Sequence, residues 1–310
     1  MAESTSQPKP APSKGAVFLR RLTSFVVLWT VVLGALFYAP PTISNIVFVL
    51  IIALLTWAGL VEFYGIVRKL GLACYSRWGI FAGLLLIVAT FLFFTEHLGK
   101  DTTPGRVNDF ETSFIIIFVL GLCVRQFVSK QTRTGVVAIS TTLFGLMYVA
   151  WLLNFIQKIN FFPYPNAHGD EGHYYVLYFI LVTKFSDCGA YAIGSLIGKH
   201  KMIPRISPGK TWEGFGGAIL GSTVASVVFL KLGGSHLYGM TMKHAIILGV
   251  ILSTAAVVGD LIESLFKREA GLKDSGNLFP GIGGILDLLD SLLFNAPLMY
   301  LYLRHVLTHP

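Results

Sequence analysis

Long apolar runs, separated by short polar segments, recur along the whole chain. Nearly every run approaches the 20 or so residues that an α-helix needs to cross about 30 Å of hydrocarbon. The pattern therefore predicts an all-α integral membrane protein, a polytopic bundle of about nine transmembrane helices. The predicted spans cover residues 22–39, 43–61, 78–95, 112–128, 135–157, 174–197, 213–232, 242–262 and 284–303.

The composition supports a membrane protein, and the charge distribution orients it. Hydrophobic residues make up 54% of the 310 residues and charged residues only 13%, about half the charged fraction of a soluble domain. The net charge of +8 comes from lysines and arginines in short loops beside the spans. It therefore indicates membrane topology and not nucleic-acid binding. The bias of these bases to one side predicts a cytoplasmic N-terminus in the inner (plasma) membrane.

The polar residues divide the chain into three parts. Residues 1–20, rich in Ser, Pro and Lys, are expected to form a disordered cytoplasmic tail. Residues 21–165 form an N-terminal transmembrane scaffold whose spans carry few polar groups. Residues 166–310 form a C-terminal transmembrane region expected to be catalytic, with its active-site loops in the cytoplasm, because ionisable residues enter the spans from Lys184 onward.

The isolated charges of the scaffold are expected near the ends of the spans, outside any functional site. Glu111 and Lys158 are expected on the outer side of the membrane, in or beside the connecting loops. Glu62, at the inner end of the second span, is expected at the membrane interface and not in a site.

Three residues at helical spacing mark the sixth span. Lys184, Asp187 and Tyr191 follow at intervals of three and four residues, so they share one helix face. An internal ion pair between Lys184 and Asp187 is the simpler alternative. The pairs Gly194–Gly198 and Gly217–Gly221 suit close helix packing, either within the chain or between the chains of a homodimer.

A Pro-Gly turn beside a lysine precedes the seventh span. Here the hydroxyl groups of Ser207 and Thr211 surround Lys210, which predicts a phosphate-binding segment. The Gly-x4-Gly-Lys-Ser/Thr spacing of a P-loop is absent from this segment. A plain helix start at Thr211 or Trp212 is the structural alternative, but it does not explain Lys210.

Acidic, hydroxyl and basic groups share one face at the inner end of the eighth span. Asp260 is followed by Ser264, Lys267 and Arg268 at spacings that continue one helix face. A solvated loop that begins at Lys267 and includes Lys273 and Asp274 is the alternative explanation of these charges. It does not account for the acids inside the flanking spans.

Two further acids begin the ninth span. Asp287 and Asp290 are three residues apart and share a face, so the fold can bring both to Asp260. Converging carboxylates at a membrane entrance are costly unless cations neutralise them. Magnesium takes carboxylate and phosphate oxygens together, so Asp260, Asp287 and Asp290 are the predicted metal ligands.

These residues resemble the signature of the phosphatidate cytidylyltransferase family, also called CDP-diacylglycerol synthase. That signature reads approximately Ser-x-x-Lys-Arg-x4-Lys-Asp-x-Gly-x3-Pro-Gly-His-Gly-Gly-x2-Asp-Arg-x-Asp. The matching residues are Ser264, Lys267, Arg268, Lys273, Asp274, Pro280, Gly281, Gly283, Gly284, Asp287 and Asp290, with further likeness at Asp187, Ala190, Tyr191, Gly194 and Ile206 to Gly214. The chain departs from the signature at Ile282 and Leu288, where the family usually has His and Arg.

The resemblance implies transfer of CMP from CTP to phosphatidic acid at the face of a lipid bilayer, with two Mg²⁺ ions. It implies Asp260 and Asp287 as ligands, with Asp290 or Asp187 assisting, and leaves open whether a monovalent cation also binds. The implied catalytic residues are Asp187, Lys210, Lys267, Asp287 and Asp290. The implied substrate-binding residues are Ser207, Lys210, Thr211, Ser264, Lys267, Arg268, Lys273, Asp274, Gly283 and Gly284.

Two other functions fit parts of the pattern. A CTP-dependent polyprenol or phytol kinase would use related residues to move the γ-phosphate to an alcohol. A non-catalytic lipid carrier or transporter would line a path with the intramembrane charges.

Overall fold

The computed structural model describes residues 30–31, 33–34, 37, 40–97, 103–129, 133–164, 171–272, 275–276 and 284–308. Within these residues the chain is almost entirely helical, with one short β-hairpin. The elements are α2 (Pro41–Lys69), α3 (Ser76–Phe94), α4 (Pro104–Val128), α5 (Gly135–Gly145), η1 (Leu146–Trp151), α6 (Leu152–Asn160), α7 (Glu171–Ile197), β1 (Lys201–Ile203), β2 (Ser207–Thr211), α8 (Trp212–Gly233), η2 (Gly234–His236), α9 (Met242–Glu269), α10 (Ile285–Tyr302) and η3 (Leu303–Leu307).

The predicted spans are confirmed wherever the structure describes them. Among the described residues, eight helical segments are long and apolar enough to cross a membrane. They coincide with the second to ninth predicted spans, and α5, η1 and α6 together form one of them. The first predicted span, 22–39, lies almost entirely outside the described residues, as does the predicted tail 1–20.

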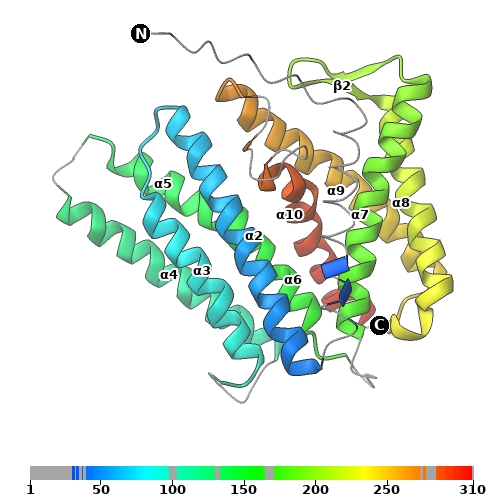
Figure 1. The fold of residues 1–310 in the computed structure, drawn as a ribbon, viewed down its shortest axis with the longest axis horizontal. Coiled ribbons are helices and arrows are strands. Elements are labelled where there is room, and N and C mark those ends of the chain that lie inside the picture. The colour runs from blue at the N-terminus through cyan, green and yellow to red at the C-terminus, as the bar shows by residue number, and fades with distance from the viewer. Residues whose placement is uncertain are drawn as a thin grey trace, which may run out of the picture.

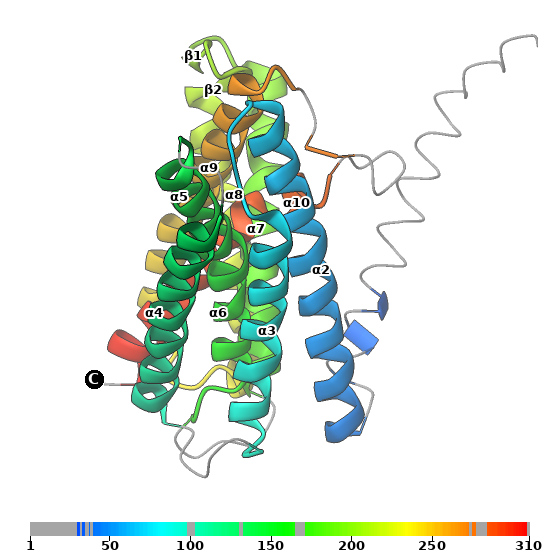
Figure 2. The same ribbon diagram turned by 90° about the vertical axis from the view of Figure 1, so that its left-hand side faces the viewer.

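The helices lie side by side, and successive ones run in opposite directions (Figure 1). The hairpin of β1 and β2 projects from one end of the bundle, and we call this the hairpin end. The last turns of α7 and α9 and the first turns of α8 and α10 meet there, while α10 ends at the other end (Figures 1 and 2).

Helix α10 occupies the centre of the bundle. It has the highest buried share of any candidate span among the described residues, 61% of its most apolar window. It packs against α2, α6, α7 and α9. A helix that is apolar on all sides belongs in the interior, so the acids in the first turns of α10 enter the core with it.

Small residues allow α7 and α8 to approach closely. A Cβ atom at Gly189 would overlap the carbonyl oxygen of Gly217, and one at Gly221 would lie 2.7 Å from the carbonyl oxygen of Phe185. A Cβ atom at Gly194 would lie 3.3 Å from the Cα atom of Gly214. The predicted glycine pairs therefore pack within the chain, which removes the sequence argument for a homodimer interface at these positions.

A closed network of polar groups pins α4 to α6 inside the bundle. Glu111 and Lys158 are 2% and 3% exposed, and the Glu111 Oε2 atom lies 2.7 Å from the Lys158 Nζ atom. Glu111 also accepts hydrogen bonds from Asn154 and Trp151, and Lys158 donates to Asn108. Both residues lie near the helix ends beside the connecting loops, as the sequence predicts, but the sequence does not reveal that their side chains are buried and paired. The two charges pair in the interior, where each satisfies the other's hydrogen-bonding groups.

Replacing Lys158 with Met should destabilise the protein by about 3–5 kcal/mol, because Glu111 would stay buried without its counter-charge. The Glu111→Gln/Lys158→Met double variant should recover part of that loss, since the amide still accepts hydrogen bonds and carries no charge. Denaturant unfolding in detergent measures both, and Lys243→Met, at an exposed lysine, is the control. Equal stability of the single variant and the unchanged protein would contradict a structural role for the pair.

Candidate active site

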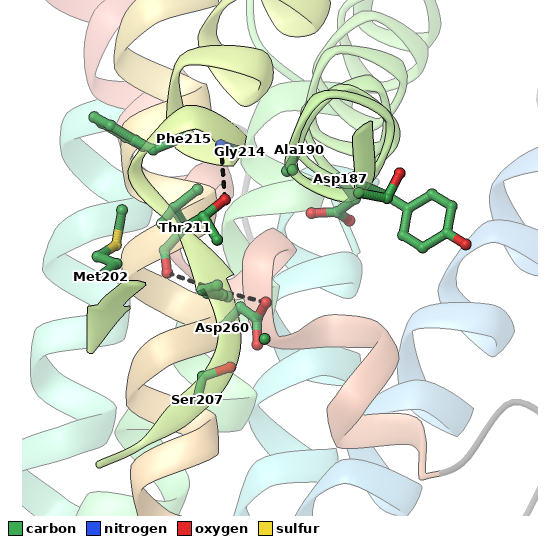
Figure 3. Close-up of a pocket in the computed structure, with 14 residues that line it drawn as sticks. Asp187, Ala190, Met202, Ser207, Thr211, Gly214, Phe215 and Asp260 are labelled. Atoms are coloured by element: carbon green, nitrogen blue, oxygen red, sulfur yellow. Dashed lines mark hydrogen bonds and ion pairs between the residues drawn. The ribbon is translucent and has the colours of Figure 1, made fainter. Parts of the chain in front are cut away.

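A cavity of about 520 Å³ lies beneath the hairpin, between α7, α8 and α9. Figure 3 shows Asp187 on α7, Ser207 and Thr211 on the hairpin, and Asp260 on α9 around it. Lys210 also lines the cavity. Five residues that the sequence predicts for the site therefore meet in one cavity, although they come from three separate parts of the chain.

The hairpin places Lys210 against α9. Thr211 ends the hairpin and caps α8, because its Oγ1 atom accepts a hydrogen bond from the Gly214 amide at 3.1 Å. The helix start that the sequence offered as an alternative is therefore present. One residue earlier, the Lys210 Nζ atom lies 2.7 Å from the Asp260 Oδ2 atom and donates to the Val257 carbonyl at 3.2 Å. The lysine that the turn did not explain faces an acid of the site.

Three carboxylates gather where α9 meets α10. Within the described residues, Asp260, Glu263 and Asp290 each offer a carboxylate oxygen, and these atoms lie within 4.8 Å of one another. Asp260 is partly exposed to the cavity, whereas Glu263 is fully buried and Asp290 is 8% exposed. The sequence predicts Asp260 and Asp290 for this place but misses Glu263, which lies one helical turn after Asp260 on the same face.

Glu263 is an unusual buried acid. Its Oε2 atom lies 2.5 Å from the Lys267 Nζ atom. Neither carboxylate oxygen makes a hydrogen bond of good geometry within the described residues. Lys267 supplies one positive charge, but a fully buried carboxylate is costly unless further cations, a proton or hydrogen bonds complete its surroundings.

Both carboxylate oxygens of Asp287 accept hydrogen bonds. Its Oδ1 atom accepts from Lys267 at 2.5 Å, while its Oδ2 atom accepts from the amides of Gly284 at 2.8 Å and Ser275 at 3.2 Å. The acid thus holds the start of α10 and the adjoining loop. Its role as a metal ligand stays a prediction, which would require Asp287 to exchange one of these partners.

The remaining predicted residues near α9 support the hairpin or lie outside the described residues. Ser264 contacts Asp260 at 3.4 Å, and the Arg268 Nε atom donates to the Ile206 carbonyl at 3.2 Å. Gly284 begins α10 beside Ser275, where a side chain would overlap the Ser275 hydroxyl group. Three predicted residues, Lys273, Asp274 and Gly283, and the departure at Ile282 lie outside the described residues.

Lys184 and Asp187 pair with each other at the edge of the cavity. The Lys184 Nζ atom lies 3.7 Å from the Asp187 Oδ2 atom, so the predicted alternative of an internal ion pair is present. Asp187 nevertheless lines the cavity. Lys184 also donates to the Leu288 carbonyl at 3.1 Å, which joins α7 to α10.

Glu62 supports the site from the scaffold. Its Oε1 atom accepts from the Ile285 amide at 3.0 Å, and its Oε2 atom accepts from the Leu286 amide at 2.8 Å and the Ser275 hydroxyl at 3.0 Å. Glu62 therefore caps the first turn of α10 with a full negative charge, which the helix dipole favours. Its only sequence signal is a lone acid at the end of an apolar span.

The cluster has the chemistry of a cation and phosphate site. The cluster has two more acids than lysines, and one divalent cation would neutralise this excess negative charge. The acids are Asp187, Asp260, Glu263, Asp287 and Asp290, and the lysines are Lys184, Lys210 and Lys267. The cavity beside Asp260 and Lys210 is large enough for a small-molecule ligand.

Comparisons with known proteins agree with this chemistry. The profile of the Cytidylyltransferase family matches residues 19–306. A phosphatidate cytidylyltransferase of Staphylococcus aureus (strain COL) is 40% identical over 258 residues, covering 79% of this chain and 95% of the relative. Another, from Staphylococcus haemolyticus, is 35% identical over 236 residues, covering 72% of this chain and 88% of the relative.

Replacing Glu62 with Gln should loosen the start of α10, because an amide has one acceptor oxygen and no charge to offer the helix. Amide hydrogen exchange at Ile285 and Leu286 should accelerate about tenfold, the equivalent of one hydrogen bond to a charged group. Glu96→Gln, a change at an exposed acid in a loop, is the control. Unchanged protection of both amides would show that Glu62 does not hold this turn.

Proposed function

The chain belongs to the cytidylyltransferase family as a phosphatidate cytidylyltransferase, and we propose that the cluster beneath the hairpin transfers CMP from CTP to phosphatidic acid. The products are CDP-diacylglycerol and pyrophosphate. The observation that carries this assignment is the cluster of Asp260, Glu263 and Asp290, which reaches the cavity through Asp260, where Lys210 faces it. Membrane-spanning helices place that cavity within reach of a lipid headgroup.

The reaction exchanges one phosphorus–oxygen bond for another. An oxygen of the phosphatidic acid phosphate forms a bond to the α-phosphorus of CTP. The bond from the α-phosphorus to the oxygen bridging to the β-phosphate breaks, and pyrophosphate leaves with the electron pair. The attacking oxygen is already anionic, so the site needs no strong base. Its task is to bring two anions together and to stabilise the charge on the leaving group.

Lys210 is well placed for that task. It extends from the hairpin into the cavity and faces Asp260. An ammonium group in this partly dry site would attract the phosphates of CTP and stabilise charge that develops as pyrophosphate leaves. Lys267 is less exposed and pairs with both Glu263 and Asp287, and through Asp287 it keeps the start of α10 in place.

The carboxylate donors fit Mg²⁺. Asp260 and Asp290 would hold it as the sequence predicts, and we add Glu263, whose buried oxygens have no hydrogen bond of good geometry within the described residues. A bound Mg²⁺ would neutralise phosphate charge and orient the α-phosphate. A second ion, implied by the family resemblance, would need oxygens of Asp187 or Asp287.

We propose that the hairpin end faces the cytosol, with the N-terminus on the same side. The basic residues Arg68, Lys69, Arg77, Lys201 and Arg205 lie in segments at this end of the bundle. Such a concentration of bases marks the cytoplasmic side of a membrane protein. CTP would then enter the cavity from the cytosol, and the lipid from the adjoining leaflet of the cell's inner membrane.

The fate of the CTP phosphates tests the reaction. Purified protein with Mg²⁺, phosphatidic acid and CTP should place label from the α-phosphate, and none from the γ-phosphate, into the lipid. Labelled pyrophosphate should appear in equal amount when the label is on the γ-phosphate. Label from the γ-phosphate in the lipid would indicate a lipid kinase, and unlabelled lipid in both reactions would indicate a non-catalytic protein.

Removing a carboxylate from the cluster should abolish most turnover without unfolding the protein. Asp260→Asn, Glu263→Gln and Asp287→Asn should each lower kcat by about 100-fold or more, because each removes charge that holds Mg²⁺ or orders Lys267. The matched control is Glu269→Gln, which changes an exposed acid on the same helix. Normal turnover in Glu263→Gln would remove this residue from the proposed ligand set.

A further inference from the structure

Lys184 is a charged residue inside a membrane-spanning helix, at the contact between α7 and α10. Its side chain is 26% exposed. Placing a lysine inside a membrane-spanning helix costs free energy, so a lysine found there is normally paired and functional. Its Nζ atom donates to the Leu288 carbonyl at 3.1 Å and lies 3.7 Å from the Asp187 Oδ2 atom. Lys184 thus reaches the turn of α10 that begins with Asp287 and ends with Asp290.

The charge of Lys184 acts on the acids of the cluster. The Lys184 Nζ atom lies beside Asp187 and the Leu288 carbonyl, and Asp290, two residues after Leu288, shares its cluster with Asp260 and Glu263. Asp290, at 8% exposed, has little water to screen these charges. Lys184 therefore helps to set the electrostatic potential at the carboxylates that would receive a cation.

The side chain at position 288 carries no charge of its own. Position 288 lies between Asp287 and Asp290, and the signature that the chain resembles usually has Arg there. Leu288 offers no charged side chain, and Lys184 contacts the main-chain carbonyl of that same residue. A cation is therefore present at this point of α10, supplied by a neighbouring helix.

We propose that Lys184 is a positioning residue, which fixes the first turn of α10 against Asp187 and sets the cation affinity of the carboxylate cluster. This inference rests on the proposed function, because it concerns the same metal site. A cation that only held two helices together would affect the amount of folded protein. A cation that sets the potential of the cluster must also change how tightly a divalent metal binds.

The test measures metal binding directly, with Mn²⁺ alone as the probe, by electron paramagnetic resonance on the full-length protein in detergent. In Lys184→Met, loss of the nearby positive charge should tighten Mn²⁺ binding about tenfold or more. CMP transfer should fall at least tenfold in kcat, because the first turn of α10 is no longer fixed. Lys184→Arg should keep the wild-type affinity, and Lys243→Met, at an exposed lysine at the other end of α9, should behave as wild type.

Two variants at position 288 complete the test. Leu288→Arg combined with Lys184→Met should return Mn²⁺ affinity toward the wild-type value, because α10 then supplies the cation itself. Leu288→Arg alone should weaken Mn²⁺ binding about tenfold by adding a second cation, and it keeps the inference testable should Lys184→Met not fold.

The outcomes separate this inference from the proposed function. Unchanged Mn²⁺ affinity in both Lys184→Met and Leu288→Arg, in protein whose wild type transfers CMP, would overturn the role of Lys184 alone. A wild type that binds Mn²⁺ with the expected dependence on Lys184 but transfers no CMP would support the role of Lys184 and contradict the proposed reaction.

Discussion

The cost of placing charge inside an apolar helix bundle governs this structure. A carboxylate or ammonium group removed from water must find a counter-charge and hydrogen bonds, or the fold loses several kcal/mol of stability.

Two charged networks in the bundle meet this requirement differently. Around Glu111 and Lys158 the partners are complete and come from protein alone, so the network holds α4 and α6 together. Around Asp260, Glu263 and Asp290 acids outnumber lysines, and Glu263 keeps oxygens without a hydrogen bond of good geometry within the described residues. The first network is structural, and the second is suited to binding a cation.

The geometry of the site therefore depends on the packing of the scaffold helices. Helix α10 is the most buried candidate span that the structure describes, and it carries two acids of the cluster. Its first turn is held by Glu62 from α2, by Lys184 from α7 and, through Asp287, by Lys267 from α9. The hairpin is tied to α9 through Lys210 and Arg268. Each support comes from a different helix, so the site forms only when the bundle is assembled.

The sequence predicts the fold better than the site, for a physical reason. Span length and hydropathy are local properties, so the second to ninth spans appear almost where they were expected. The acids and lysines of the motifs are also visible locally, and Asp187, Lys210 and Asp260 do meet. The partners of Glu62, Glu111 and Lys158 are not predicted, because they lie more than 40 residues away along the chain. Glu263 is not predicted although it lies on the same helix face as Asp260, since only its burial beside Asp260 and Asp290 distinguishes it from a surface acid.

The depth of the cluster accounts for a reaction between a water-soluble nucleotide and a membrane lipid. With about 1.5 Å of rise per residue, Asp260 lies about 14 Å from the last residue of α9, and Asp290 lies about 8 Å from the first residue of α10. Headgroup layers occupy the outer 5 to 8 Å or so on each side of a roughly 30 Å hydrocarbon core. The acids therefore lie within about three turns of the hairpin end of these two helices. A lipid phosphate can approach them while its chains stay in the leaflet, and the cavity beneath the hairpin can receive CTP without passage across the membrane. A site at mid-depth would require the nucleotide to leave water, and a site on the hairpin surface would require the lipid to leave the bilayer.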